Sequence, residues 1–287
     1  MTSAPLSLTR LTRDFPVLSE SLKGIERAAA TDAPVLILGE AGTGRSTLAR
    51  AIHGASPRSA GPLVEVDVGA IPSTLFESEL FGYRAGAFTG AEQASDGRAG
   101  RAEGGTLVLD HVEELPLATQ PKLLRLVAER RYAPLGDVER TADLRFLAIG
   151  SEDLPVRVAR ETFRLDLFYR LEVLAFLLPP LRERRRDLPA ILDHLLSDLA
   201  IRFGRPDLEL SPGARAWMLD HSWPGNLRQL RNVLERGLIL AGDGLIDPSP
   251  PEGTPEGRPR PLLEVEKEMI RNALAYTRGH QDRKSVV

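Results

Sequence analysis

The chain has 287 residues, of which 42% are hydrophobic, so it is long enough for one large domain and a smaller one. Its formal net charge is -3, which gives no reason to expect that the chain as a whole binds nucleic acid. Cysteine is absent, so disulfides and thiolate metal sites are excluded. The opening MTSAPLSLTRLTRDF has no apolar signal-peptide region, and no apolar run approaches the length of a membrane span. We therefore expect a cytoplasmic protein with no membrane partner.

The first strong signal is the segment APVLILGEAGTGRSTLARAIHGAS, residues 33–56. A short branched apolar run, a glycine-rich loop and a helical pattern follow one another, which is the context that a phosphate-binding loop requires. Gly39, Gly44 and Ser46 fit the pattern G-x-x-x-x-G-K-[ST], but Arg45 stands where lysine is expected. Arginine is bulkier, planar and forked, so it either pairs elsewhere or crowds the γ-phosphate. The alternative is a glycine-rich turn that binds nothing.

Further buried strands are predicted along the chain, with helical patterns such as residues 119–131 between them. Alternating strands and helices favour a parallel sheet that is covered on both faces. Beyond residue 186 the strand patterns stop and helical ones follow. The strands are expected at 33–39, 63–68, 105–110, 144–150 and 172–178. The expected divisions are a short N-terminal arm (1–14), an α/β domain (15–185), a helical domain (186–241), a Pro/Gly-rich linker (242–261) and a final amphipathic segment (262–287).

The apolar strand in GGTLVLDHVEELP, residues 104–116, ends in Asp110, as in a Walker B site where an aspartate holds Mg²⁺ through water. The following residue is usually a glutamate that activates the attacking water, and here it is His111. A histidine can act as a general base, because its unperturbed pKa lies near 6.5. Glu113 is a second candidate base. The alternative is a strand end with a solvated histidine.

The segment ESELFGYRAGAFTGAEQA, residues 77–94, contains GAFTGA, where glycine and alanine surround Phe88 and Thr89. Such a composition suits a mobile loop that presents an aromatic side chain to a partner. An ordinary flexible loop is the alternative.

Six segments together resemble the AAA+ domain of the sigma-54-dependent transcriptional activators, the bacterial enhancer-binding proteins. In chain order they are GEAGTGR, ESELFG…GAFTGA, GGTLVLD, FRLDLFYRL, PPLRERRRDLP and WPGNLRQLRN, and they cover about residues 15–245. The resemblance implies an α/β AAA+ P-loop NTPase fold with a doubly wound parallel sheet and a small helical lid. It implies a homo-oligomeric ring, commonly a hexamer, that uses ATP and Mg²⁺ and remodels the sigma-54 RNA polymerase holoenzyme.

The resemblance also assigns roles to residues of this chain. It places nucleotide binding at Gly39, Glu40, Ala41, Gly42, Thr43, Gly44, Arg45, Ser46, Thr47 and Arg228. Mg²⁺ would be held by Ser46 and Asp110, and catalysis would involve Asp110, His111, Arg164 and Arg170, the two arginines reaching a neighbouring subunit. The sigma-54 contact would be Gly86, Ala87, Phe88, Thr89, Gly90 and Ala91, and Asp67 and Ser151 would relay the state of the nucleotide.

Departures from the family pattern gather around one nucleotide. They are Arg45 for lysine, His111 for glutamate and Asp67 for asparagine. Separately, Ser151 stands where the family usually has an asparagine or threonine sensor, and its side chain is shorter. We expect a hydrogen bond between Asp67 and His111. Two functions therefore remain open: an activator that hydrolyses ATP, and a hydrolysis-deficient regulator that binds sigma-54 or nucleotide without productive turnover. An unrelated AAA+ enzyme is disfavoured by GAFTGA.

The segment LLEVEKEMIRNALAYTRGHQ, from residue 262, resembles the first helix of a Fis-type helix-turn-helix, but the sequence stops at DRKSVV. We expect this helix-turn-helix to be truncated, by nature or by a sequencing artefact. Enhancer DNA would then bind weakly, because a recognition helix is missing.

Overall fold

The computed structural model describes residues 6–205, 208–241, 245–248 and 250. The chain divides into two units, Met1–Ser249 and Pro250–Val287, and every element given below belongs to the first. The predicted linker beyond residue 250 and the predicted helix-turn-helix segment lie outside the described residues. None of the described helices has the length and apolar character that crossing a bilayer needs.

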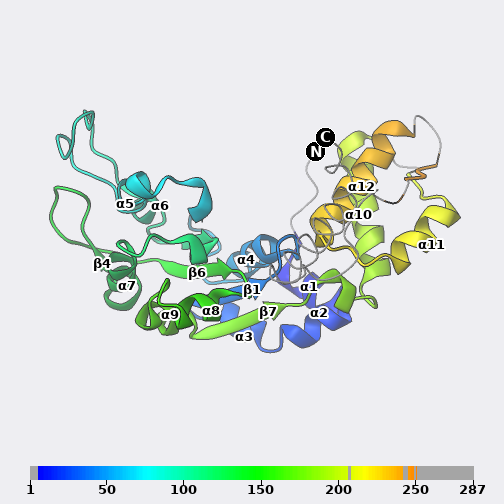
Figure 1. Ribbon diagram of the computed structural model, residues 1–287, viewed down its shortest axis with the longest axis horizontal. Coiled ribbons are helices and arrows are strands. Elements are labelled where there is room, and N and C mark those ends of the chain that lie inside the picture. Colours follow the sequence, from blue (N-terminus) through cyan, green and yellow to red (C-terminus); the bar gives the residue numbers. More distant parts are fainter. Residues whose placement is uncertain (1–5, 206–207, 242–244, 249, 251–287) are drawn as a thin grey trace, which may run out of the picture. The chain divides into compact units, whose positions relative to one another are not determined.

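A parallel five-stranded sheet with the order β2-β3-β6-β1-β7 forms the centre of the first unit (Figure 1). Each strand is one of the five short apolar runs in the sequence, and β6 is buried along its whole length. Because β1 lies between β6 and β7, the chain crosses over at the end of β1, where loops diverge and ligands bind in such sheets. The strands are β1 Val35–Gly39, β2 Leu63–Asp67, β3 Thr106–Asp110, β6 Arg145–Gly150 and β7 Leu174–Leu178.

Alternate residues of the strands enter two different cores, one on each face of the sheet. In β1, Val35 and Ile37 belong to one core and Leu36 to the other, as the two-residue period of a strand dictates. The first core packs against α1 Leu8–Asp14, α2 Pro16–Ser21, α3 Ile25–Ala29 and α4 Arg45–Gly54. The second packs against α5 Ser73–Phe81, α6 Gly97–Arg101, α7 Gln120–Glu129, α8 Leu154–Ala159 and α9 Leu165–Leu171. Short elements complete this part: β4 Arg131–Tyr132 pairs with β5 Arg140–Thr141, and the 3₁₀ turns are Val68–Ala70, Val112–Glu114 and Leu181–Glu183.

The segment expected to be an N-terminal arm instead contributes to the core. Residues 8–14 form α1, and the Ser7 side chain caps it by accepting a hydrogen bond from the backbone N–H of Arg10 (3.3 Å). Leu8 and Leu11 are buried in the same core as the lid helices. The α/β part therefore begins before residue 15, where the sequence analysis had placed its boundary.

The helical part consists of α10 Leu188–Phe203, α11 Pro212–Asp220 and α12 Asn226–Leu240 (Figure 1). Its centre is the fully buried Trp223, whose indole N–H donates to the carbonyl oxygen of Met218 (2.8 Å). Part of the predicted linker belongs to this packing, because Ile246 is buried and its backbone pairs with Glu209 and Ser211. The apolar side chain of Ile246 gives this stretch a place in the core, which its proline and glycine neighbours had obscured.

Candidate nucleotide-binding site

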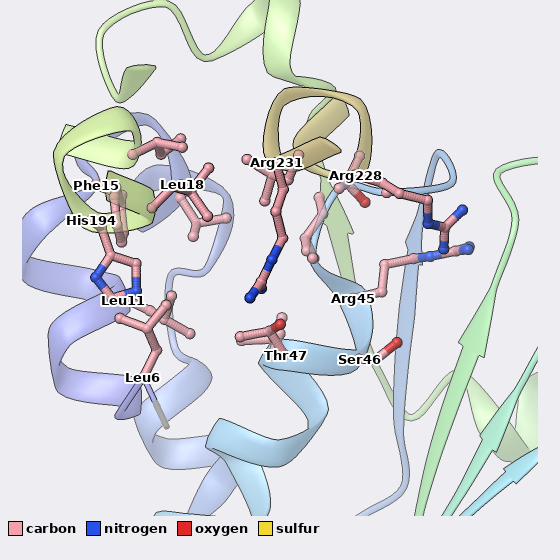
Figure 2. A pocket seen from close by; sticks show the side chains of 18 of the residues that line it. Leu6, Leu11, Phe15, Leu18, Arg45, Ser46, Thr47, His194, Arg228 and Arg231 are labelled. Atoms are coloured by element: carbon pink, nitrogen blue, oxygen red, sulfur yellow. The ribbon is translucent and has the colours of Figure 1, made fainter. Parts of the chain in front are cut away.

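A pocket of about 850 Å³ lies where α4 follows β1, and both the α/β part and the helical part line it (Figure 2). One end is polar and contains residues 42–47 with Asp110 and His111. At the other end the side chains of Leu6, Leu11, Phe15 and Leu18 are apolar, and His194 lies beside them (Figure 2). The volume lies within the range of about 300–1,000 Å³ that small-molecule sites occupy. The pocket therefore suits a ligand with a polar end and an apolar end.

The predicted phosphate loop is present and joins β1 to α4. Gly42 and Gly44 have φ angles of +81° and +103°, which favour glycine. A Cβ atom on residue 42 would lie 2.6 Å from the carbonyl oxygen of Gly225, so a larger residue would push the loop off the helical part. The backbone N–H of Leu227 donates to the carbonyl oxygen of Gly42 (2.9 Å). The start of α12 is therefore fastened to the loop.

Glu40 fastens the same junction and does not line the pocket. Its carboxylate accepts two hydrogen bonds from Arg182 (2.8 and 2.6 Å) and one from the Asn226 side chain (3.1 Å). Asn226 also donates to the carbonyl oxygen of Ala41 (3.1 Å). Glu40 thus holds the loop against the helical part, which is a supporting role and not a contact with the pocket.

Arg45, which replaces the expected lysine, is buried, with 7% of its surface exposed. Its Nη1 donates to the carbonyl oxygen of Gly39 (2.8 Å) and to that of Gly150. These carbonyls lie at the ends of the neighbouring strands β1 and β6. The guanidinium is therefore held by main-chain oxygens at the carboxyl ends of two inner strands. The sequence did not predict these partners.

Ser46 and Asp110 lie together, as a magnesium site requires. The Ser46 hydroxyl donates to Oδ2 of Asp110 (3.1 Å), and Oδ1 of Asp110 accepts from the backbone N–H of His111 (2.9 Å). No group of three or more metal-binding side chains occurs in the part of the chain that the structure describes. A hydroxyl and one carboxylate fit Mg²⁺, which in such sites takes its remaining ligands from water and substrate phosphates.

His111 and Asp67 make the predicted contact, with Nδ1 of His111 lying 2.9 Å from Oδ1 of Asp67. The backbone of His111 is left-handed (φ 55°), which turns its side chain toward the end of β2. An ionised carboxylate only accepts hydrogen bonds, so Nδ1 carries the proton and a neutral ring leaves Nε2 as an acceptor. The arrangement orients a histidine for accepting a proton at Nε2.

Glu113, the second candidate base, is buried and points away from this pair. A Cβ atom on Gly150 would lie 3.4 Å from its Oε2, and that oxygen has no hydrogen-bond partner among the described residues. Glu113 does not line the pocket. The structure thus gives no support to Glu113 as a base.

The other predicted residues lie outside this pocket. Arg164 is paired with Asp166 (2.7 Å), and Arg170 donates to the carbonyl oxygen of Ala128 (3.2 Å). The Ser151 hydroxyl accepts from the backbone N–H of Asp153 (3.1 Å) and is not among the lining residues. The six residues 86–91 form a turn in which Gly86 donates to the carbonyl oxygen of Ala91 (2.7 Å). Within it Phe88 is 43% exposed and its ring packs on Tyr83 (4.9 Å between centroids).

Several lining residues were missed by the sequence analysis, among them the side chains of Leu6, Leu11, Phe15 and Leu18 at the apolar end. A buried ion pair positions this end: Asp187 accepts from Arg184 (3.1 Å) and from the backbone N–H groups of Val17 and Leu18 at the start of α2 (2.9 and 3.0 Å). Burial lowers the pKa of the Arg184 guanidinium, and Asp187 opposes that shift. The spacing of Leu8, Leu11, Phe15 and Leu18 is the signal that could have predicted this apolar face.

A parallel sheet with a phosphate loop at its crossover and a helical lid defines an α/β AAA+ P-loop NTPase fold. Residues 11–176 match the model of the Sigma-54 interaction domain, and residues 182–250 match the AAA+ ATPase lid domain. The chain belongs to the sigma-54 interaction domain family.

Individual proteins agree with this assignment. The chain is 46% identical over 233 residues to the alginate biosynthesis transcriptional regulatory protein AlgB of Pseudomonas aeruginosa, covering 81% of this chain and 52% of AlgB. It is 33% identical to NtrX from Brucella abortus in complex with ADP, with a TM-score of 0.73, covering 87% of this chain and 59% of NtrX. NtrX in complex with ATP gives the same TM-score, 0.73, at 32% identity, covering 89% of this chain and 60% of NtrX. The chain spans 50–60% of the length of the first curated relatives that it matches.

Proposed function

We propose that this chain is the ATP-binding part of a sigma-54-dependent transcriptional regulator, acting in the cytoplasm as a homo-oligomeric ring, commonly a hexamer. The observation that carries the proposal is the pocket, in which a phosphate loop and the Ser46–Asp110 pair face an apolar end. The base of ATP would occupy the apolar end, and its phosphates would meet the backbone N–H groups at the start of α4. Residues 86–91, with Phe88 and Thr89 exposed, would contact sigma-54.

Hydrolysis is proposed to be slow. When bound, Mg²⁺ would neutralise the phosphate charge that develops during transfer. Asp67 orients His111 so that Nε2 can accept the proton of an attacking water. Arg45, however, is engaged with the carbonyl oxygens of Gly39 and Gly150 and contributes less to the γ-phosphate than a free lysine would.

Arg164 and Arg170 are proposed to act on the nucleotide of a neighbouring subunit. Both side chains are exposed and neither lines the pocket of its own copy. An arginine supplied in trans can raise the rate of phosphoryl transfer by about 10³–10⁵. Assembly of a ring would therefore be needed for turnover, and Arg164 would have to leave its ion pair with Asp166.

A second function is favoured by the same replacements: a regulator that binds nucleotide or sigma-54 without productive turnover. Two observations support this second function: Arg45 is hydrogen-bonded to main-chain oxygens, and histidine stands at position 111 in place of the expected glutamate. Contact with enhancer DNA would in either case need a C-terminal helix-turn-helix, whose residues in this chain lie outside the described ones.

The experiment that separates the two functions is steady-state ATP turnover by the purified chain, with and without sigma-54, at concentrations where the ring assembles. Binding of a fluorescent ATP analogue is measured in parallel. Slow turnover with firm binding supports the first function, and binding with no turnover supports the second. A chain that binds neither nucleotide nor sigma-54 would rule out both.

A further inference from the structure

The pocket is rich in arginine, but most of these side chains are already engaged. Arg50 is paired with Glu65 (2.8 Å), Arg184 with Asp187 (3.1 Å) and Arg202 with Glu235 (3.1 Å). Arg45 is held by the two main-chain carbonyls. In the part of the chain that the structure describes, the lining guanidinium groups without such a partner are Arg228 and Arg231.

Arg228 and Arg231 are three positions apart on α12, so they lie on one face of the helix. The backbone start of α12 fixes the place of Arg228 over the phosphate loop, because a Cβ atom on Gly42 would lie 3.1 Å from the Cβ of Arg228. Arg231 follows one turn later. Figure 2 shows its side chain extending into the pocket, with Arg45, Ser46 and Arg228 to one side and Leu11, Leu18 and His194 to the other.

This position is the junction between the polar and the apolar end. A nucleotide lying along the pocket, with its base at the apolar end, would place its α-phosphate at this junction and its γ-phosphate toward Asp110. A guanidinium presents several donors in a fixed fork that matches phosphate oxygens. Arg231 is exposed, so no burial cost prevents it from meeting a phosphate there.

We propose that Arg231 contacts the α-phosphate of the bound nucleotide and so binds ATP and ADP alike. This inference rests on the proposed nucleotide binding and adds a residue that the sequence motifs did not indicate. Arg228 starts over the phosphate loop, where the terminal phosphates would lie, so the contact that distinguishes ATP from ADP would fall to Arg228. Arg231 would hold either nucleotide and keep it in the pocket after hydrolysis.

The test compares Arg231→Ala with Arg228→Ala and with the control Arg236→Ala. Arg236 is exposed on the same helix and does not line the pocket. Affinities for ATP, ADP and adenosine are measured by displacement of a fluorescent ADP analogue. A hydrogen bond to a charged group predicts that Arg231→Ala weakens ATP and ADP by the same factor, about tenfold to a hundredfold, and leaves adenosine unchanged. Arg231→Lys should recover part of the loss, and Arg236→Ala should match the parent.

Three results would overturn the inference. The first is that Arg231→Ala leaves all three affinities unchanged. The second is a loss of affinity for ATP alone, which would place Arg231 on the γ-phosphate. The third is an equal loss of affinity for adenosine, which would place Arg231 on the base and ribose. Circular dichroism of each variant checks that it is folded, and Arg231→Gln gives a second neutral variant if Arg231→Ala is unfolded. If the parent chain itself binds none of the three ligands, the proposed nucleotide binding fails and this inference fails with it.

Discussion

Arg45 donates a hydrogen bond to the carbonyl oxygen of Gly150, a residue that follows it by more than a hundred positions in the chain. A second bond from the same Nη1 atom reaches Gly39 (2.8 Å), so one guanidinium joins the ends of β6 and β1. The charge at position 45 therefore serves as a link between the carboxyl ends of two neighbouring strands of the sheet.

The first prediction is that Arg45→Lys raises the affinity for ATP relative to ADP. A lysine ammonium is a compact charge on a flexible stem, so it can turn from the strand ends toward a γ-phosphate. One additional charge-assisted hydrogen bond corresponds to about a tenfold gain. Competition titrations of both nucleotides measure it. An unchanged ratio of ATP to ADP affinity would show that the hydrogen bonds of Arg45 to Gly39 and Gly150 do not keep its charge from the γ-phosphate.

The second prediction concerns the three positions around the nucleotide. The variant carrying Arg45→Lys, His111→Glu and Asp67→Asn should hydrolyse ATP faster than the parent by about 10²-fold, since general-base catalysis typically contributes ~10²–10⁴. His111→Glu alone should gain little, because it would place a second carboxylate beside Asp67. The effects should be strongly non-additive, since all three residues act on one ligand.

Steady-state rates at saturating ATP, for the parent, the three single variants and the triple variant, measure these effects. Assembly of the ring is checked in each case by light scattering. A triple variant that assembles yet turns over no faster than the parent contradicts the interpretation of these positions. If the Asp67–His111 hydrogen bond already supports turnover in the parent, Asp67→Ala should lower the steady-state rate of ATP hydrolysis.

The strands of the sheet were predictable because each is a short apolar run, and the central strands β3, β6 and β1 are buried along almost their whole length. The phosphate loop was equally visible, since its glycine spacing is local. The partners of Arg45 were not, because they are carbonyl oxygens whose positions depend on the neighbouring strand β6. Helix α1 was missed for a different reason: Leu8 and Leu11 are separated by polar residues and precede a proline, so a short helix there resembled an arm.

The third prediction is that Phe88→Ala or Thr89→Ala abolishes sigma-54 binding and leaves nucleotide binding unchanged. Residues 86–91 lie outside the lining of the nucleotide pocket, and the half-exposed ring of Phe88 packs edge-to-face on Tyr83. Val138→Ala, at a residue that is 74% exposed, serves as the control. Pull-down with sigma-54 and titration with an ATP analogue give the two measurements. Variants that bind sigma-54 as tightly as the parent would exclude this loop as the contact.

The fourth prediction concerns pH and the helix that follows the phosphate loop. Burial, assisted by the charge of Arg145, lowers the pKa of His53, whose Nδ1 lies 2.9 Å from the hydroxyl of Thr106. As the pH falls below about 6.5, the ordinary pKa of histidine, His53 takes up a proton in the unfolded chain more readily than in the folded chain. The free energy of unfolding therefore carries no penalty from His53 above that pH, and it decreases as the pH falls below it. His53→Gln should shrink the loss of unfolding free energy between about pH 7.5 and about pH 5.5 in urea titrations. An equal loss in parent and variant would contradict the assignment.

The last prediction concerns the room at Gly150. A Cβ atom there would lie 3.2 Å from Cγ1 of Val112, 3.3 Å from Cδ2 of Leu38 and 3.4 Å from Oε2 of Glu113, all tighter than or at the limit of ordinary contact. Gly150→Ala should therefore lower the free energy of unfolding by about 1 kcal/mol, at the lower end of overpacking costs.

In the Glu113→Ala background one of the three crowding atoms is gone, so the same change at Gly150 should cost less, with a coupling of about 0.5 kcal/mol or more. Gly54→Ala is the matched control, because a Cβ on this residue at the end of α4 meets nothing within 4 Å. Urea unfolding of the parent, the three single variants and the double variant measures the cycle. If Gly150→Ala lowers the free energy of unfolding equally in the two backgrounds, the Glu113 side chain can move aside without loss of stability and does not require glycine at position 150.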